Sequence, residues 1–189
     1  MPSSRSSLQI RRRGAGFTLI ELMVTMVLLA VMLTLAAPSF ITFQRNSELT
    51  ATANSFVAAL SAARSEAMKR QLDTYVIPGG GTEFWTNGWV VYVDTNNNQT
   101  FDAATDLLIV KQDALPSAMT ATGMADGTSH YVRFSGSGFM SKIDGSFGLT
   151  NAIDFSNGGK TRRVIASPSG RFRVCDPVAD TVSCNTTTF

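Results

Sequence analysis

Residues 16–23 read Gly-Phe-Thr-Leu-Ile-Glu-Leu-Met, and an apolar run continues from them to Ala37. From Phe17 to Ala37 the run holds one charged side chain, Glu21, and neither Gly nor Pro. As a helix, this run would be roughly 31 Å long, enough to cross the hydrocarbon core of a bilayer. An ionisable side chain in such a run is costly, so Glu21 is expected to have a functional partner.

The same block, with the basic residues Arg11–Arg13 before it, resembles the processing site of type IV pilins and pseudopilins. The resemblance implies that a prepilin peptidase cleaves after Gly16 and that the new N-terminal residue, Phe17, is N-methylated. It also implies that Glu21 pairs with the N-terminal ammonium of a neighbouring subunit during assembly. An uncleaved anchor fits the basic flank equally well, but the Gly16–Phe17 junction favours cleavage.

Three segments follow from this assignment. They are a leader (1–16), a transmembrane and filament-core helix (17–37), and a periplasmic or extracellular globular domain that includes the rest of the helix (38–189). The expected location is the bacterial inner membrane, with a single pass, and then a pilus or pseudopilus after assembly.

The exported part is close to neutral. The chain has 16 Lys and Arg against 14 Asp and Glu, but Arg5 and Arg11–Arg13 lie in the predicted leader, so cleavage leaves 12 basic side chains. Any contact with nucleic acid must therefore come from a local basic patch.

The hydrophobic pattern predicts one long helix, from about residue 17 to 72, bent at Pro38, whose second half is amphipathic. Short β-branched and aromatic runs follow, which indicate an antiparallel sheet and an α+β fold. The predicted strands are 74–77, 88–93, 107–110, 119–122, 131–134, 153–155, 164–166 and 172–175.

Three segments of this half resemble the GspH/FimT group of minor pseudopilins: Trp85–Asp94, Phe134–Gly138 and Pro168–Cys175. The resemblance implies a pilin-like fold, in which antiparallel sheets pack on the second half of a long bent N-terminal helix. Trp85 and Trp89 are expected in the core.

A basic window lies between Asp154 and Asp176, with no acidic residue inside it. Residues two apart on a strand share a face, so Arg171 and Arg173 should lie together, with Phe172 facing the core. If the flanking strands form a hairpin, Arg162 or Arg163 should join the same edge. The basic residues of the window are Lys160, Arg162, Arg163, Arg171 and Arg173.

Gly170-Arg171-Phe172-Arg173 also resembles the Gly-Arg-x-Arg motif of FimT-type minor pilins, which bind DNA during natural transformation. The resemblance implies a DNA contact at Gly170, Arg171 and Arg173. Charge alone extends that contact to Lys160, Arg162 and Arg163. Arginine makes forked contacts with phosphate, so binding should be sequence-independent and salt-sensitive. A solvated basic edge, or one that docks an acidic partner subunit, remains the alternative.

Cys175 and Cys184 are the only cysteines, and in an exported chain they predict a disulfide, with two free thiols as the alternative. No cofactor, metal site or catalytic motif is evident, and His130 is the only histidine, so an enzyme is not expected. Asp94–Asp106 has the alternating oxygen side chains of a calcium loop. It has Gln99 where such loops have Gly and Thr105 where they have Glu, which favours a polar hairpin loop.

Two functions fit these patterns. The first is a minor type IV pilin that binds DNA during uptake. The second is a structural H-type pseudopilin of a type II secretion pseudopilus, or a subunit that primes pilus assembly, without DNA binding. Both require partner pilins or pseudopilins.

Overall fold

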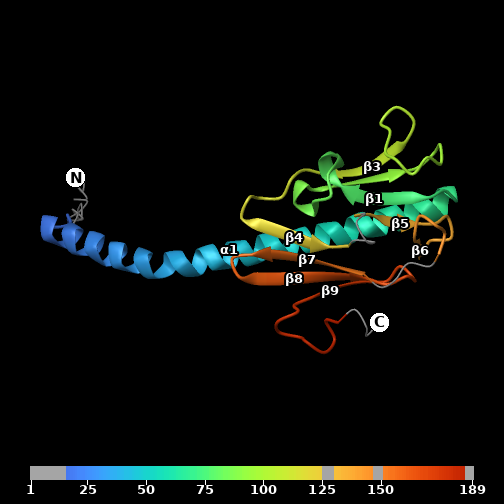
Figure 1. Ribbon diagram of the computed structural model, residues 1–189. Coiled ribbons are helices and arrows are strands. Elements are labelled where there is room, and N and C mark those ends of the chain that lie inside the picture. The colour runs from blue at the N-terminus through green and yellow to red at the C-terminus, as the bar shows by residue number, and fades with distance from the viewer. Residues whose placement is uncertain (1–15, 125–129, 147–150, 186–189) are drawn as a thin grey trace, which may run out of the picture. The chain divides into compact units, whose positions relative to one another are not determined.

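The computed structural model describes residues 16–124, 130–146 and 151–185, without the side chains of 35–38 (Figure 1). One long helix, α1 (Leu19–Arg70), precedes the strands, and two short 3-10 turns, Gly79–Gly81 and Trp85–Asn87, lie between the first strand and the second. The strands are β1 (Thr74–Pro78), β2 (Trp89–Val93), β3 (Leu107–Gln112), β4 (Met119–Gly123), β5 (Val132–Phe134), β6 (Met140–Ser141), β7 (Asn151–Asn157), β8 (Lys160–Ala166) and β9 (Phe172–Cys175).

The chain divides into two compact units, Met1–Ile41 and Thr42–Phe189. In the first, Thr18 caps α1, since its Oγ1 accepts a hydrogen bond of 3.3 Å from the backbone N–H of Glu21. The large apolar side chains from Phe17 to Leu33 are each more than half exposed. A continuous apolar surface of this kind marks a site that a membrane or another protein covers.

Within the described residues, no single helix meets the length and composition required of a membrane span. Two helical stretches, Leu19–Thr34 and Ser39–Arg70, meet the requirements of length and composition only when they are taken together as a bent pair. Pro38, where the sequence predicts a bend, lies in the break between them. The predicted leader lies outside the described residues, apart from Gly16.

The second unit holds two antiparallel sheets. One has five strands in the order β3-β2-β1-β5-β6, and the other has four in the order β4-β7-β8-β9. In the four-stranded sheet, Asp154 of β7 lies opposite Arg163 of β8. Ile165 of β8 in turn lies opposite Arg173 of β9. Figure 1 shows both sheets along the second half of α1, which confirms the pilin-like α+β fold.

The core of this unit forms where α1 meets the two sheets. Phe56 of α1 is fully buried, and its ring meets those of Trp85, Trp89 and Phe155 at centroid distances of 5.4, 5.0 and 5.5 Å. Edge-to-face contacts of this kind add to the stabilisation from burial. The prediction that both tryptophans are core residues is confirmed. In the described part of the chain, the buried core residues run from Leu49 to Cys184, so they all belong to the unit from Thr42.

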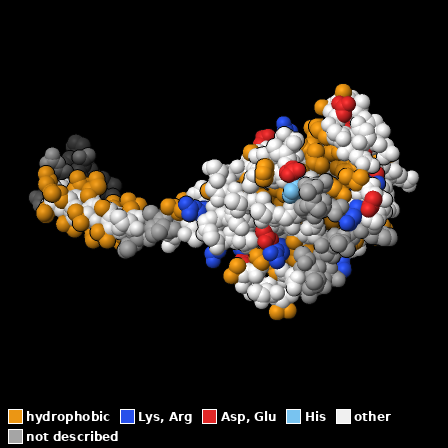
Figure 2. Space-filling view, viewed as in Figure 1, with side chains coloured by type: hydrophobic (Ala, Val, Ile, Leu, Met, Phe, Trp, Pro, Cys, Tyr) orange, Lys and Arg blue, Asp and Glu red, His pale blue; other side chains and the backbone are white. Residues whose placement is uncertain are grey.

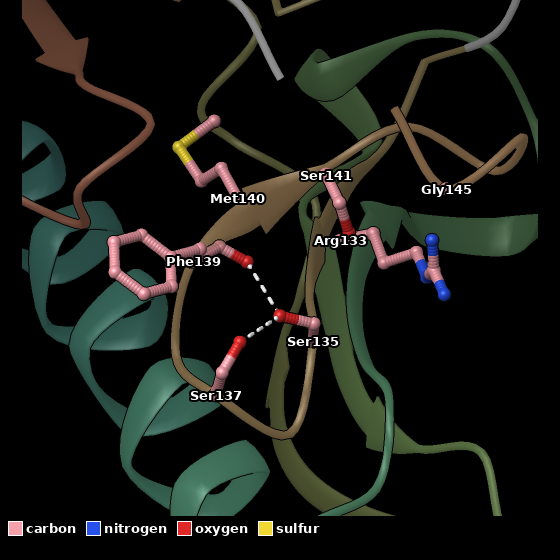
Figure 3. Close-up of a pocket in the computed structure, with 7 residues that line it drawn as sticks. All are labelled: Arg133, Ser135, Ser137, Phe139, Met140, Ser141 and Gly145. Carbon is pink, nitrogen blue, oxygen red and sulfur yellow. Dashed lines mark hydrogen bonds between the residues drawn. The ribbon is translucent and has the colours of Figure 1, made fainter. Parts of the chain in front are cut away.

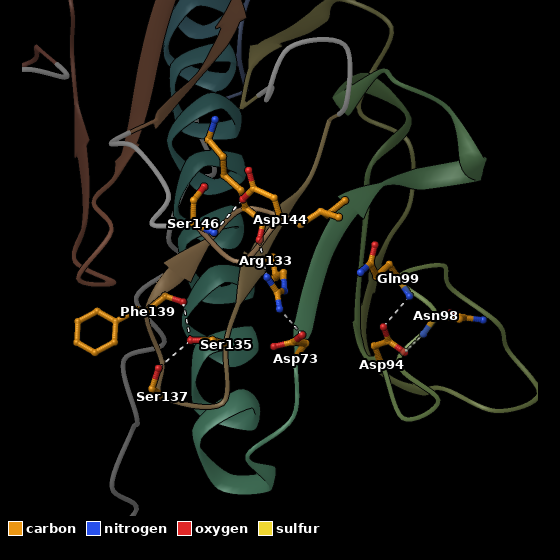
Figure 4. A network of polar contacts seen from close by, with 12 residues as sticks. Asp73, Asp94, Asn98, Gln99, Arg133, Ser135, Ser137, Phe139, Asp144 and Ser146 are labelled. Carbon is orange, nitrogen blue, oxygen red and sulfur yellow. Dashed lines mark hydrogen bonds and ion pairs between the residues drawn. The ribbon is translucent and has the colours of Figure 1, made fainter.

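The loop Asp94–Asp106 is held by its own carboxylates. Asp94 accepts the backbone N–H groups of Asn98 and Gln99 at 3.1 and 2.8 Å (Figure 4). Asp106 accepts those of Thr95 and Asp102 at 3.1 and 2.8 Å. No group of three or more acidic, His or Cys side chains in the described part of the chain is arranged to hold a metal ion. The carboxylates therefore act as loop caps.

A second apolar cluster lies on the β1–β2 face beneath this loop, where Tyr75 and Tyr92 stack at 5.4 Å. Burial raises the pKa of Tyr75 to about 12 and raises that of Tyr92 further. The sequence analysis missed this cluster. It also missed strand β6, which is only two residues long.

Candidate nucleic-acid interface

Strands β8 and β9 pair as a hairpin, the condition on which the sequence placed Arg162 or Arg163 at the edge of Arg173, and this pairing separates the arginines onto two faces. Val164 and Ala166 face the core, and Arg162 alternates with them onto the same side of β8. Arg163 and Ile165 lie on the face of β8 away from α1, opposite Cys175 and Arg173, and Ile165 is fully buried there. It is therefore Arg163, and not Arg162, that shares this outer face with Arg173.

Arg163 is engaged by the acidic residue on the neighbouring strand. Its Nε and Nη2 donate to both carboxylate oxygens of Asp154, each at 2.7 Å, and its Nη1 donates to the backbone carbonyl of Cys184 at 3.2 Å. The side-chain bonds to Asp154 raise the pKa of Arg163. A forked pair of this kind fixes the guanidinium, so Arg163 stabilises the sheet and the C-terminal loop.

Arg162 joins three segments. Its Nη1 donates to Asp176 at 2.6 Å and to the carbonyl of Thr161, and its Nη2 donates to Asn46 of α1 at 3.0 Å. Backbone N–H groups of Ala179 and Val178 lower the pKa of Asp176, and Arg162 lowers it further. Arg162 therefore ties β8 to the helix and to the C-terminal loop.

Arg173 lies near a third carboxylate. The hydroxyl and backbone N–H of Ser183 lower the pKa of Asp180, and the positive charge of Arg173 contributes to the same shift. Cys175 and Cys184 are joined by a disulfide, which closes the loop that carries both Asp176 and Asp180. The window that looks acid-free in sequence is thus lined in space by Asp154, Asp176 and Asp180.

Lys160 lies at the far end of β8 from Arg171. It is exposed in the β7–β8 turn, and Arg45 of α1 lies against the neighbouring Gly158. Ala166 is six positions further along β8, a span of roughly 20 Å. The structure does not bring Lys160 and Arg171 together.

Arg171 is exposed, and it follows a tight turn at the Ala166 end of the hairpin. The backbone N–H of Gly170 donates to Ser167 at 2.8 Å, and the N–H of Ser167 donates to the carbonyl of Arg171 at 2.9 Å. Gly170 has φ +74°, a conformation that other residues adopt only with strain. This closed turn fixes the backbone from which Arg171 projects.

Arg64 of α1 bonds both to this turn and to a second turn, which lies between β5 and β6. Its Nη1 donates to the carbonyl of Gly170 and its Nε to the carbonyl of Gly138, both at 3.0 Å. A Cβ at position 170 would lie 2.4 Å from Arg64 Nε, and one at position 138 would lie 2.7 Å from Met68. A side chain at either position would therefore displace a side chain of α1, which gives Gly170 a structural role beside its predicted DNA contact.

The second turn, between β5 and β6, is equally close to the helix. A Cβ at Gly136 would lie 2.7 Å from the backbone of Gln71, and the backbone N–H of Met140 donates to the carbonyl of Pro168 at 2.9 Å. The turns 135–139 and 167–171 are thus adjacent. Sequence reasoning recognised both glycine motifs but not that Arg64 joins them.

The charges are dispersed on the face of the globular unit that Figure 2 shows. On this face, Lys and Arg side chains stand at separate places, and several have Asp or Glu beside them. Arg171 and Lys160 are the exposed members of the predicted set, and they lie at opposite ends of β8. The end of the β8–β9 hairpin that carries Arg171 is therefore the best candidate for a surface that binds a polyanion.

Comparisons with known proteins assign the family. A family model described as "Type II transport protein GspH" matches residues 52–170, and one described as "Prokaryotic N-terminal methylation motif" matches residues 11–37. A search of curated proteins gave no match to the sequence.

Solved structures share the fold. The type IV minor pilin FimU of Pseudomonas aeruginosa, in one crystal form, is 18% identical and superposes with a TM-score of 0.54, over 76% of this chain and 99% of that chain. In a second crystal form, FimU is 20% identical to this chain and superposes with a TM-score of 0.52, over 72% of this chain and 100% of that chain. The minor pseudopilin EpsH from the type 2 secretion system of Vibrio cholerae is 17% identical, with a TM-score of 0.49, over 69% of this chain and 98% of that chain. Since the GspH model covers well over half of the sequence, the chain belongs to the GspH family of minor type IV pilins and pseudopilins.

Proposed function

We propose that this protein is a minor pilin, without enzymatic activity, that binds DNA outside the cell through the Arg171 end of its β8–β9 hairpin. The observation that carries the proposal is the exposure of Arg171 on a rigid turn, on the side of β9 that Arg173 also occupies. Guanidinium groups bind phosphate by charge and by forked hydrogen bonds. Contact with the DNA backbone alone makes binding independent of sequence and sensitive to salt.

Export and assembly depend on the other end of the chain. A prepilin peptidase cleaves after Gly16, Phe17 becomes the methylated N-terminus, and Glu21 pairs with the N-terminal ammonium of a neighbouring pilin. The match to the methylation motif and the exposed apolar side chains of residues 17–33 support this route. The apolar helix lies in the inner membrane, with the globular unit in the periplasm, and enters the filament after cleavage.

A second candidate is a structural H-type subunit of a secretion pseudopilus, or a subunit that primes pilus assembly. The observation that favours it is the engagement of Arg162 and Arg163 by Asp176 and Asp154, which leaves the outer face less basic than the sequence indicates. In that role Arg171 would face another subunit.

A gel-shift assay with the unit from Thr42 separates the two candidates. We expect the wild-type unit to retard a duplex of random sequence, and the Arg171→Ala/Arg173→Ala variant to lose at least about fivefold in affinity, the phosphate contact of the exposed Arg171 at roughly 1 kcal/mol or more. Lys111→Ala, which removes an exposed cation from β3 of the other sheet, is the matched control. Equal retardation by all three proteins, or by none, would favour the structural candidate.

A further inference from the structure

A hollow of about 540 Å³ lies against the β5–β6 hairpin (Figure 3). One of its lining residues, Met140, donates its backbone N–H to Pro168 of the Arg171 turn. Phe139 stands at one end of the hollow and Arg133 at the other, with serine hydroxyls between them. The other lining residues are Ser135, Ser137, Met140, Ser141 and Gly145. Its volume is in the range of small-molecule sites.

The serine hydroxyls of this hollow suit a polar occupant. Ser135 Oγ and Ser137 Oγ form an exposed pair, 2.8 Å apart. A hydroxyl oxygen can accept two hydrogen bonds, so an occupant that offers donors can bind to this pair. The charge of Arg133 is already balanced, because its Nη2 bonds Asp73 at 2.5 Å (Figure 4). The hollow therefore suits a neutral polar group rather than an anion.

Phe139 adds an aromatic surface. Its side chain is 45% exposed, although it belongs to a turn fixed by Arg64 and by the bond from Met140 to Pro168. An exposed aromatic ring on a rigid turn loses little conformational entropy when a flat apolar group stacks on it. A flat group with a polar edge would then meet both the ring and the serine hydroxyls.

The position of Phe139 connects the hollow to the proposed DNA contact. Phe139 follows Gly138 and Arg171 follows Gly170, and the carbonyls of both glycines lie 3.0 Å from the same guanidinium, that of Arg64. Proteins bind single strands by stacking bases on aromatic rings and by neutralising the phosphates with cations, and these two adjacent turns carry one residue of each kind.

We propose that the Phe139 hollow binds an unpaired nucleobase of a DNA strand whose backbone Arg171 holds. This inference rests on the proposed function, and it adds a preference for single-stranded over duplex DNA. In a duplex the bases are stacked and paired, so only the phosphate contact at Arg171 remains available.

The test compares three labelled probes by fluorescence anisotropy with the disulfide-bonded unit from Thr42: a thymidine 12-mer, an abasic 12-mer with the same backbone, and a 12-base-pair duplex. We expect the thymidine strand to bind at least about fivefold more tightly than the abasic strand, since stacking one base contributes that much or more. Phe139→Leu should abolish this difference and leave abasic binding unchanged. Phe84→Leu, at an aromatic side chain that is 68% exposed elsewhere, should change neither.

A second measurement uses tryptophan fluorescence to report on the aromatic ring at position 139. In Phe139→Trp, the new indole should be quenched by the thymidine strand and not by the abasic one, above the constant emission of the buried Trp85 and Trp89. Equal affinity for thymidine and abasic strands, or no effect of Phe139→Leu, would overturn the base site. The DNA proposal would stand in that case if binding still depended on Arg171. Failure to bind any of the three probes would overturn both.

Discussion

Arg64 occupies the space that a side chain at position 170 would need. Its Nη1 donates to the carbonyl of Gly170 at 3.0 Å, and its Nε would lie 2.4 Å from a Cβ there. Gly159 offers a matched control, because it has a similar φ of +79° and open space around its Cβ position.

Gly170→Ala should therefore destabilise the unit more than Gly159→Ala does. Both substitutions cost roughly 1–3 kcal/mol for the left-handed backbone, and only the first also displaces Arg64. Urea unfolding of the unit from Thr42 measures the difference. Equal losses of unfolding free energy for the two variants would show that Arg64 moves aside at no cost in stability.

Arg64→Lys tests the same contact by changing the helix residue instead of the glycine. A lysine ammonium cannot span two carbonyls with the planar fork that Arg64 uses for Gly138 and Gly170. We expect a loss of roughly 1.5–3 kcal/mol, the contribution of a charge-assisted hydrogen bond. Arg70→Lys, on the exposed side of the same helix, should cost less than about 0.5 kcal/mol. Similar losses of stability for Arg64→Lys and Arg70→Lys would show that Arg64 does not hold the two turns.

The disulfide fixes the loop that carries Asp176 and Asp180. Replacement of Cys175 and Cys184 by serine should lower the free energy of unfolding by roughly 2–3 kcal/mol, because the unfolded chain regains the entropy of a short closed loop. The measurement is the unfolding midpoint with and without a reductant. A midpoint that reductant leaves unchanged would contradict a structural role for the disulfide.

Acid should weaken the same loop. The pKa of Asp176 is lower in the folded protein than in the unfolded chain, where it is about 3.9. The stability that this carboxylate contributes is therefore complete above the unfolded pKa and is lost as the pH falls through the lower folded pKa. We expect Asp176→Asn to reduce the dependence of the unfolding free energy on pH below about pH 4. An unaltered acid profile would mean that Asp176 is not held by the loop.

Local sequence patterns predicted most of the fold. The helix lies within two residues of its predicted limits, and eight of the nine strands were predicted, since each is a β-branched or aromatic run bounded by turn residues. Strand β6 is too short to carry a pattern. The two-faced alternation of Arg171, Phe172 and Arg173 follows from strand geometry alone.

The electrostatics of the site could not be predicted in this way. Asp154 is nine residues from Arg163 in sequence, but the β7–β8 register places them opposite each other. Asp176 reaches Arg162 only because the chain turns after β9. Arg64 looks like one more polar residue of an amphipathic helix, and its two glycine partners are 74 and 106 residues away. Contacts between distant segments depend on tertiary packing, which sequence spacing does not encode.

The salt dependence of DNA binding tests the central claim most directly. For the unit from Thr42 and a random duplex, the slope of log Kobs against log salt concentration counts the phosphates that the protein neutralises. We predict that Arg171→Ala/Arg173→Ala reduces the magnitude of this slope by about one, the phosphate contact of the exposed Arg171, while Lys111→Ala leaves it unchanged. A slope that is the same for the wild type and the double variant would contradict the assignment of DNA binding to Arg171 and Arg173.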